Sequence, residues 1–440
     1  MQDQFYTTAD VIAAQIKGDE GFLARFSGES SDFVRFNRSA VRQAGMVEQR
    51  YLTLELFRGK CHAAQTLSLT GEQDLDADVV KAAVATLRDI LNDTAEDPHF
   101  LINTTPQSTT RVMPSALGTP EESVDAVLKA GAGHDMVGFY AAGPIHSGFA
   151  NSLGQRNWDT VKAFNIDLSF YLRADKAVKM GHAGTTWNAA AFAHKAGLAK
   201  ERLAALARPA KTIQPDGYRV YLAPAAMEDI LSMMSWGGFG LADHRTATTP
   251  LIKMVEQGVK LNSAVTISEN MRDGLSPGFQ NQGFVKPDNV TLIENGAYKD
   301  CLVSPRSAAE FDEAPNGADD SESPVALDMA AGTLAHEDIL KTLGTGIYVG
   351  NLWYLNYSDR NAARLTGMTR FATFWVENGE IVAPVNVMRF DDSIYRMLGD
   401  NLVALTAERD LLLSTDTYEA RSTRSMRLPG AIIDDMRMTL

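Results

Sequence analysis

The segment Trp375-Val376-Glu377-Asn378-Gly379-Glu380-Ile381 predicts a β-hairpin in the last third of the chain. Asn-Gly provides the two positive φ angles of a tight turn, and hydrophobic residues flank it on both sides. A second segment of the same kind, Ile293-Glu294-Asn295-Gly296, lies earlier in the chain. These hairpins predict antiparallel sheets throughout residues 218–440, which we expect to form a β-rich C-terminal domain.

A middle α+β domain is predicted over residues 115–208, before the boundary that Pro209 to Gly217 suggests. It begins at Thr119-Pro120-Glu121-Glu122, a capping box with proline at the first helical position. Hydrophobic patterns then predict strands over 136–142, 145–151, 161–172 and 177–184, followed by a helix over 189–207.

Residues 1–92 repeat this order of helix, antiparallel strands and helix, and we expect an N-terminal α+β domain there. Leu52, Leu54 and Leu56 alternate on one face of a predicted strand, and short strands are expected over 22–26 and 33–36. The polar residues 93–114 are predicted to be a linker. The fold class is α+β, with mainly antiparallel sheets.

Composition limits the possible functions. Of 440 residues, 45% are hydrophobic and 22% charged, as in ordinary globular proteins. The formal net charge of -14 argues against a direct nucleic-acid partner. Two cysteines, Cys61 and Cys301, suit a reducing compartment. We found neither a signal peptide nor an apolar run long enough for a bilayer, so we expect a cytoplasmic protein without membrane contact.

Familiar catalytic motifs are incomplete. His336-Glu337 is not followed by the second histidine of a zinc-protease helix. Gly274-Leu275-Ser276-Pro277-Gly278 has the letters of a nucleophile elbow, but Pro277 lacks the N–H that an oxyanion hole needs. Cys61 and Cys301 fall on predicted strands, where buried unreactive thiols are the default. No catalytic residue and no metal ligand is therefore assigned.

One segment combines aromatic and polar groups that can bind a peptide-like ligand. We expect the substrate or partner surface to include Trp353, Tyr354, Asn356, Tyr357, Asp359, Arg360, Asn361, Thr366 and Gly367. The alternative is a packed loop with local Asp–Arg pairs.

An ordered set of segments resembles the TldD/PmbA family, described as modulators of DNA gyrase and as zinc-dependent peptidases. The resemblance is carried by Gly346-Ile347-Tyr348-Val349, Leu365-Thr366-Gly367 and the hairpin over 375–381 followed by Pro384-Val385. Further matches lie at 150–154, 290–296 and 428–435, so all three regions are covered.

The resemblance implies a multi-domain α+β fold and a role in proteolysis. In the TldD-like branch, a histidine-glutamate helix and a distal cysteine hold zinc. The corresponding segments here, residues 225–236 and 418–430, contain no histidine and no cysteine. The chain is therefore more similar to the PmbA/TldE-like branch, which implies no cofactor of its own and zinc in a TldD-like partner.

From this resemblance we expect a non-catalytic subunit that pairs with a TldD-like zinc peptidase, or with itself, and closes a chamber around unfolded or modified peptides. Two alternatives remain open. One is a self-contained hydrolase that uses Cys301 or an Asp–Arg–Asn cluster. The other is a regulatory binding protein, as the gyrase description suggests.

Overall fold

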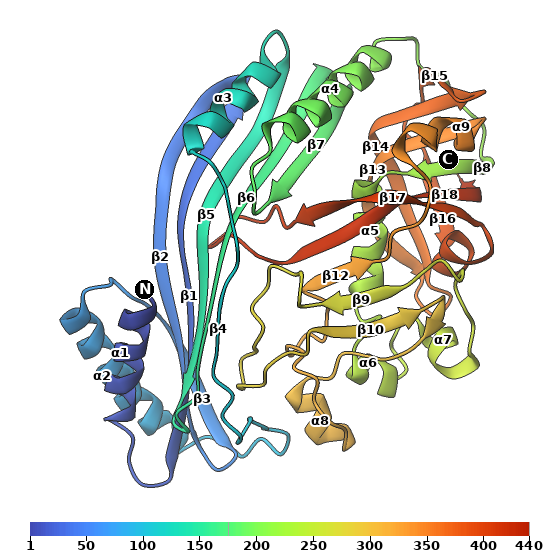
Figure 1. Ribbon diagram of the computed structural model, residues 1–440. Coiled ribbons are helices and arrows are strands. Elements are labelled where there is room, and N and C mark those ends of the chain that lie inside the picture. Colours follow the sequence, from blue (N-terminus) through green and yellow to red (C-terminus); the bar gives the residue numbers. More distant parts are fainter. Residues whose placement is uncertain (175, 440) are drawn as a thin grey trace.

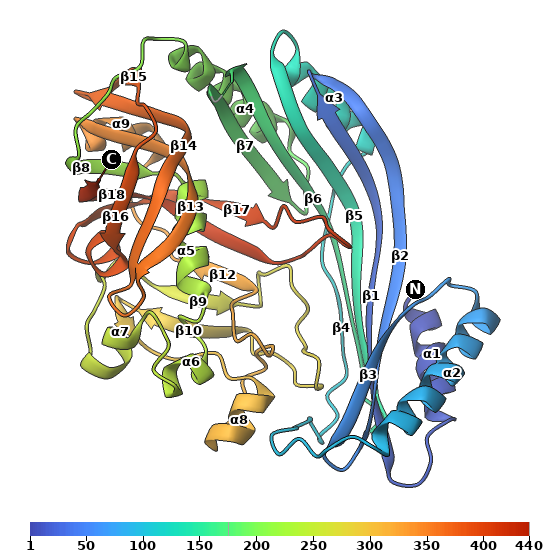
Figure 2. The same cartoon turned by 180° about the vertical axis from the view of Figure 1, so that it is seen from behind.

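Two β-sheets stand side by side in the computed structural model, which describes residues 1–174 and 176–439 (Figures 1 and 2). The first sheet contains seven strands and belongs to the N-terminal half. Its strands run in the order β3-β2-β1-β5-β6-β4, and β7 pairs with the upper part of β6. The strands are β1 (Glu20–Asn37), β2 (Ala40–Arg58), β3 (Cys61–Ser68), β4 (Thr109–Val112), β5 (Asp135–Asn151), β6 (Arg156–Arg173) and β7 (Lys176–Gly184).

The predicted N-terminal and middle domains share this one sheet. β1 and β5 pair antiparallel from Leu23 opposite Asn151 to Phe36 opposite Gly138. The predicted linker is not free of structure, because β4 pairs in parallel with β6. The short strands expected over 22–26 and 33–36 are one long strand, and those over 136–142 and 145–151 are another. Residues 27–32, which separate the two predicted segments, continue the pairing of β1 with β2.

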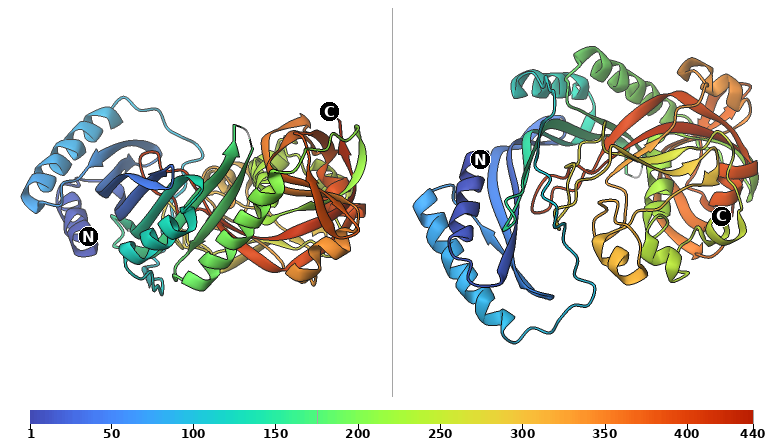
Figure 3. Two further views of the ribbon diagram at one scale, coloured as in Figure 1. Left: turned by 90° about the horizontal axis from the view of Figure 1, so that it is seen from above. Right: turned by 60° about the horizontal axis from the view of Figure 1, so that its bottom comes forward.

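Four helices cover one face of the seven-stranded sheet. Figure 3 shows α1 and α2 on the side of this sheet that faces away from the second sheet. The helices α1 and α2 pack on the lower half, where Leu52, Leu54 and Leu56 are fully buried as their alternation predicted. The helices α3 and α4 pack on the upper half, and α4 also contacts the second sheet. Their bounds are α1 (Gln2–Ala13), α2 (Gln73–Leu91), α3 (Pro120–Gly131) and α4 (Ala189–Leu206).

The second sheet contains eleven strands. Within it β8, β13, β14, β16 and β18 pair in a closed ring, since β18 pairs with β16 along one edge and with β8 along the other. The strands are β8 (Asp216–Leu222), β9 (Ile267–Asn270), β10 (Asn289–Glu294), β11 (Ala297–Tyr298), β12 (Ala326–Met329), β13 (Gly346–Asp359), β14 (Arg364–Glu377), β15 (Glu380–Pro384), β16 (Arg389–Ser393), β17 (Leu402–Leu413) and β18 (Ser425–Met438).

Helix α5 packs against β13 and β18, and its apolar side belongs to the largest hydrophobic cluster of the chain's described residues. Shorter helical elements lie around this second sheet. Their bounds are α5 (Pro224–Ser235), α6 (Leu241–Arg245), α7 (Ile252–Gln257), α8 (Pro305–Phe311), η1 (His336–Asp338), α9 (Ile339–Leu343) and η2 (Arg396–Asp400). No helix in residues 1–174 and 176–439 is long and apolar enough to cross a membrane.

The turn signals read from the sequence are confirmed. Asn295-Gly296 joins β10 to β11 and Asn378-Gly379 joins β14 to β15, each with positive φ at both residues. The Thr119 hydroxyl accepts from the Glu122 N–H while the Glu122 carboxylate accepts from the Thr119 N–H, which is the predicted capping box. The α+β fold class with predominantly antiparallel pairing is therefore confirmed.

Residues 414–424, which we call the strap, connect β17 to β18 and reach across to the seven-stranded sheet (Figures 1 and 2). Arg421 anchors the strap. One terminal nitrogen of its guanidinium donates to the Ser31 hydroxyl at 3.0 Å and the Gly143 carbonyl at 3.2 Å, and the other donates to the Ala163 carbonyl at 2.7 Å. The strap thus links the C-terminal sheet to β1, β5 and β6.

Candidate functional site

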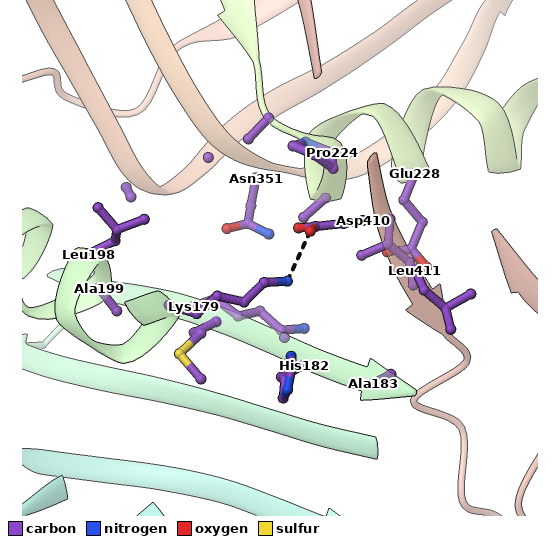
Figure 4. Close-up of a pocket in the computed structure, with 18 of the residues that line it drawn as sticks. Lys179, His182, Ala183, Leu198, Ala199, Pro224, Glu228, Asn351, Asp410 and Leu411 are labelled. Carbon is purple, nitrogen blue, oxygen red and sulfur yellow. Dashed lines mark hydrogen bonds and ion pairs between the residues drawn. The ribbon is translucent and has the colours of Figure 1, made fainter. Parts of the chain in front are cut away.

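A cavity of about 680 Å³ lies where the two sheets meet, and we call it the α5 cavity (Figure 4). Strands β6 and β7 and helix α4 form its wall on the N-terminal side. The start of α5, β13, η1 and the end of β17 form the opposite wall. The site therefore depends on both halves of the chain.

Helix α5 brings two carboxyl groups to this region. Pro224 starts the helix, and Ala226, Met227 and Ile230 are buried in the hydrophobic cluster, so Glu228 and Asp229 fall on the remaining side. Glu228 lines the cavity. Burial, together with the charge of Asp229, raises the pKa of Glu228 to about 7. Near neutral pH this carboxyl group can therefore release or accept a proton.

Asp229 is held differently. Burial raises its pKa to about 6, while a hydrogen bond from the backbone N–H of Leu352 and the charge of Lys179 act in the opposite direction. Two adjacent carboxyl groups that resist ionisation are unusual in a helix with an otherwise apolar surface. Of the two carboxyl groups, only Glu228 lines the α5 cavity.

Basic side chains line the facing wall. Lys179 pairs with Asp167 at 2.9 Å, and Lys195 on α4 pairs with Asp410 on β17 at 2.9 Å, across the junction of the sheets. The dashed line at Asp410 in Figure 4 marks this ion pair. The Lys195–Asp410 pair thus joins the two walls.

His182 on β7 also lines the cavity, and its Nε2 has no hydrogen-bond partner among the described residues. Its ring lies among Phe164, Trp187 and Phe192, and burial lowers its pKa to about 4. The imidazole is therefore neutral at physiological pH, and its Nε2 is a buried polar atom without a partner among the described residues.

Two tyrosines, on β8 and β13, add hydroxyl groups to the opposite wall. The rings of Tyr221 and Tyr348 lie 5.1 Å apart, and the Arg202 guanidinium lies 4.9 Å from the centre of the Tyr348 ring. Burial raises the pKa of both phenols, so they remain protonated. The arrangement can bind a polar ligand through neutral donors as well as charges.

The residues do not fit a zinc site. Helix α5 carries neither histidine nor cysteine, and in the described part of the chain no three His, Cys, Asp or Glu side chains are grouped closely enough to hold a metal ion. His182, His194 and His336 line the same cavity but do not form such a group. No step through a metal is therefore derived for this chain.

The residues predicted as a binding surface lie on β13, β14 and the turn between them, and none of them lines the α5 cavity. Trp353 and Tyr354 are exposed, and Arg370 stacks 3.9 Å from the centre of the Trp353 ring. Asn351, two residues before Trp353, does line the cavity. The exposed aromatic pair is therefore close in sequence to the cavity wall.

The other predicted residues make internal contacts. The Tyr357 hydroxyl donates to the Met233 carbonyl at 2.6 Å, and Arg360 lies over the rings of Trp236 and Tyr357 and donates to the Trp236 and Thr248 carbonyls. The Asn356 side-chain oxygen accepts from the Tyr357 N–H, and the Asp359 carboxylate accepts from the Ala362 N–H. The Thr366 hydroxyl donates to the Phe390 carbonyl on the neighbouring strand β16.

Asn361 lies in the turn, and the Gly367 backbone lies against Phe390 and Leu355. The segment therefore splits into exposed side chains and packed ones. The exposed ones are Trp353, Tyr354, Asn356, Asp359 and Asn361, whereas Tyr357, Arg360, Thr366 and Gly367 are partly or fully buried. Its assignment as a binding surface stays a prediction.

Other sequence candidates are placed clearly. The Ser276 hydroxyl donates to the Val325 carbonyl at 3.1 Å, in a turn and not in a nucleophile elbow. Cys301 is buried outside any strand, contrary to the prediction, and burial raises the pKa of its thiol to about 11. Cys61 does lie on a strand, β3. Neither Ser276 nor Cys301 has the environment of an activated nucleophile.

Sequence reasoning missed the cavity residues. Glu228 and Asp229 could have been noticed as an acidic pair in an apolar helix that the resemblance had already selected. Lys179, His182 and Asp410 carried no such signal, because only the packing of β7 and β17 brings them together.

Comparisons with known proteins agree on one group. Residues 215–440 match the family described as the PmbA/TldA metallopeptidase C-terminal domain. No curated protein matches the chain.

Solved structures match over the full length. TldE from Thermococcus kodakarensis is 13% identical, with a TM-score of 0.79 and complete coverage of both chains. A protein from Thermotoga maritima described as a modulator of DNA gyrase is 15% identical, with a TM-score of 0.76 and coverage of 99% and 100%. One from Bacteroides thetaiotaomicron with a similar description is 14% identical, with a TM-score of 0.75 and coverage of 99% and 98%.

Proposed function

The chain belongs to the PmbA/TldD metallopeptidase family, and from this premise we propose that it takes part in the proteolysis of unfolded or modified peptides as a subunit without its own metal. It would pair with a zinc-bearing TldD-like subunit, which performs the hydrolysis. The observation that carries this proposal is the composition of α5, which lies at the family's metal-binding segment by resemblance but carries Glu228 and Asp229 without histidine.

The α5 cavity supports a role in holding substrate. Its walls provide protonated phenols, paired lysines and a neutral imidazole, which suit the amide groups of an extended peptide. A space of about 680 Å³ accommodates a few residues and excludes a folded domain. Within a complex, such a wall would position a peptide for a metal centre on the other subunit.

The first experiment measures metal content and peptidase activity in the same preparations. We expect the isolated chain to hold no stoichiometric zinc and to leave unfolded peptides intact. Mixing it with a zinc-bearing relative from the same genome should give a complex that cleaves them. Stoichiometric zinc together with cleavage by the isolated chain would refute the proposal and favour the self-contained hydrolase.

A second experiment tests whether the α5 cavity takes part. We expect Tyr348→Phe and His182→Phe to raise KM of the mixed complex several-fold with little change in zinc content of the partner, since each removes the hydrogen-bonding groups of one side chain. Arg272→Ala, an exposed residue on another surface, is the matched control. Unchanged kinetics in both cavity variants would place substrate elsewhere.

The same preparations also test the alternative of a regulatory binding protein. A binding protein without a peptidase role would leave the partner's cleavage rate unchanged while still forming a complex. Direct DNA contact is disfavoured by the formal net charge of -14.

A further inference from the structure

A second cavity, of about 520 Å³, lies on the other side of the strap, and we call it the strap cavity. Asp319 and Val325 line it, together with three further parts of the chain. These are the face of β1, β2 and β5 that looks toward the second sheet, the segment from Ser276 to Lys286, and the end of the strap at Ser422, Thr423 and Arg424. None of its lining residues lines the α5 cavity.

Three cations line the strap cavity, against one carboxylate, Asp319. The Lys286 side chain is only 6% exposed, and its nearest acidic oxygen, on Asp319, lies at 3.4 Å. Arg25 pairs through one guanidinium nitrogen with Glu55 at 2.7 Å. The side chain of Arg424 has no partner among the described residues. In a chain with a formal charge of -14, this is a local excess of positive charge.

Hydroxyl groups surround these cations. Ser27 on β1 and Ser147 on β5 lie directly opposite each other in the sheet, and both line the cavity. Ser422 and Thr423 bring two more hydroxyls from the strap. Serine and threonine hydroxyls can donate to an anionic oxygen, while arginine and lysine provide charge-assisted hydrogen bonds.

The cavity is held in shape without a ligand. The buried Arg421 guanidinium fixes the strap to Ser31, Gly143 and Ala163, and the Asn165 amide donates to the Ser414 carbonyl at 2.9 Å. The Ser276 hydroxyl, bonded to the Val325 and Thr423 carbonyls, ties the second wall to the strap. A preformed cationic site loses less conformational entropy on binding than one that must assemble.

From the convergence of Arg25, Lys286 and Arg424 on a hydroxyl-lined cavity, we infer that the strap cavity binds an oxyanion, either a carboxylate or a phosphate group. Arg424 and Lys286 contact the anion, and the Ser27 and Ser147 hydroxyls complete its hydrogen bonds. This inference does not rest on the proposed function, because the site lies entirely within one chain and needs no metal-bearing partner.

Isothermal titration of the isolated full chain tests it with three probes: inorganic phosphate, a short peptide with a free C-terminal carboxylate, and the same peptide with an amidated C-terminus. We expect saturable binding near one equivalent for phosphate, for the free peptide, or for both, and none for the amidated peptide. Phosphate alone would identify a phosphate site, and the free peptide alone a carboxylate site. Raising the NaCl concentration should weaken binding.

Variants connect the signal to this cavity. We expect Arg424→Ala and Lys286→Met each to weaken binding about tenfold or more, as loss of a charge-assisted hydrogen bond does. Arg272→Ala removes an exposed arginine outside the cavity and should leave the Kd unchanged. Arg424 is exposed, so its variant is expected to fold even if Lys286→Met does not. Absence of saturable binding for all probes, or equal Kd values for Arg424→Ala and Arg272→Ala, would overturn the inference.

Discussion

The two faces of the seven-stranded sheet use the same strands in opposite ways. On the helix-covered face, Leu52, Leu54 and Leu56 are fully buried against α1 and α2. On the face toward the second sheet, β1 presents Arg25, Ser27 and other polar residues to the strap and its cavity. Because side chains alternate along a strand, one segment can provide both a core and a binding surface. We expect stability to reside mainly on the first face and ligand contacts on the second.

The sharpest test of this comparison is a pair of adjacent residues. Leu54→Ala removes a buried side chain and should lower the free energy of unfolding by about 4 kcal/mol. Thr53→Ala, on the opposite face, removes a partly exposed hydroxyl paired with Thr66 and should cost below about 1 kcal/mol. Urea denaturation of both variants measures the difference. Equal losses would mean that the two faces contribute alike.

Arg421 of the strap contacts the polar face, yet we expect it to contribute strongly to stability. Arg421→Met leaves the Gly143 and Ala163 carbonyls without their donor and should destabilise the protein by about 3 kcal/mol. Burial lowers the pKa of this guanidinium to about 10, and the charge of the nearby Glu29 acts in the opposite direction. Arg424→Met, on the same strap but exposed, should change stability by less than about 0.5 kcal/mol. Thermal unfolding of the two variants decides whether the buried anchor matters.

Glu228→Gln should change how stability depends on pH. The Glu228 carboxyl group titrates near 4.5 in the unfolded chain and near 7 in the folded protein. As pH rises between these values, the unfolded state loses its proton first, and the wild type loses stability. Above pH 8 the wild type should have lost roughly 2 kcal/mol of its free energy of unfolding. This is less than the full pKa shift of Glu228 implies, because the side chain is partly solvated.

Glutamine cannot ionise, so the variant should match the wild type at pH 4.5 and exceed its stability at pH 8.5. Chemical denaturation at both pH values provides the measurement. Glu337→Gln, on the exposed rim of the same cavity, serves as the control. A variant that gains nothing at pH 8.5 would show that Glu228 is already ionised without cost.

The smallest effect is expected where the two sheets meet through a partly exposed ion pair. Lys195→Met removes the partner of Asp410 and should reduce stability by about 0.5 kcal/mol. A double-mutant cycle with Asp410→Asn at low and high salt measures the coupling. A coupling above about 2 kcal/mol would make this pair a structural link comparable to Arg421.

Much of the fold was predictable because its signals are local. The Asn-Gly turns, the Thr119 capping box and the alternating leucines each fix a conformation through near neighbours. The single sheet shared by residues 1–92 and 115–208 was not predictable, since it depends on pairing between β1 and β5. The burial of Glu29 and Ser31 beside Arg421 was not predictable either, because the strap lies far from β1 along the chain.

The candidate site was harder to predict for the same reason. Glu228 lies in a segment that sequence comparison had selected, but His182 and Asp410 meet it only after the sheets dock. The bulges in β13 illustrate the limit. Tyr354 and Phe371 both adopt positive φ on paired strands, and nothing in their residue types favours that conformation. Such irregularities arise from packing against neighbouring strands.

The great length of the first sheet's strands affects how the molecule can move. β1 has 18 residues and β2 has 19, so at about 3.3 Å per residue each extends roughly 60 Å without interruption. A ladder of this length is expected to be stiff, with α1 packed near one end and α3 near the other. Opening between the two sheets would then be a hinge rotation at residues 209–217, with the strap as a tether that limits its amplitude. The strap lines both cavities, with Thr415 at the α5 cavity and Ser422 to Arg424 at the strap cavity, so its displacement would alter both.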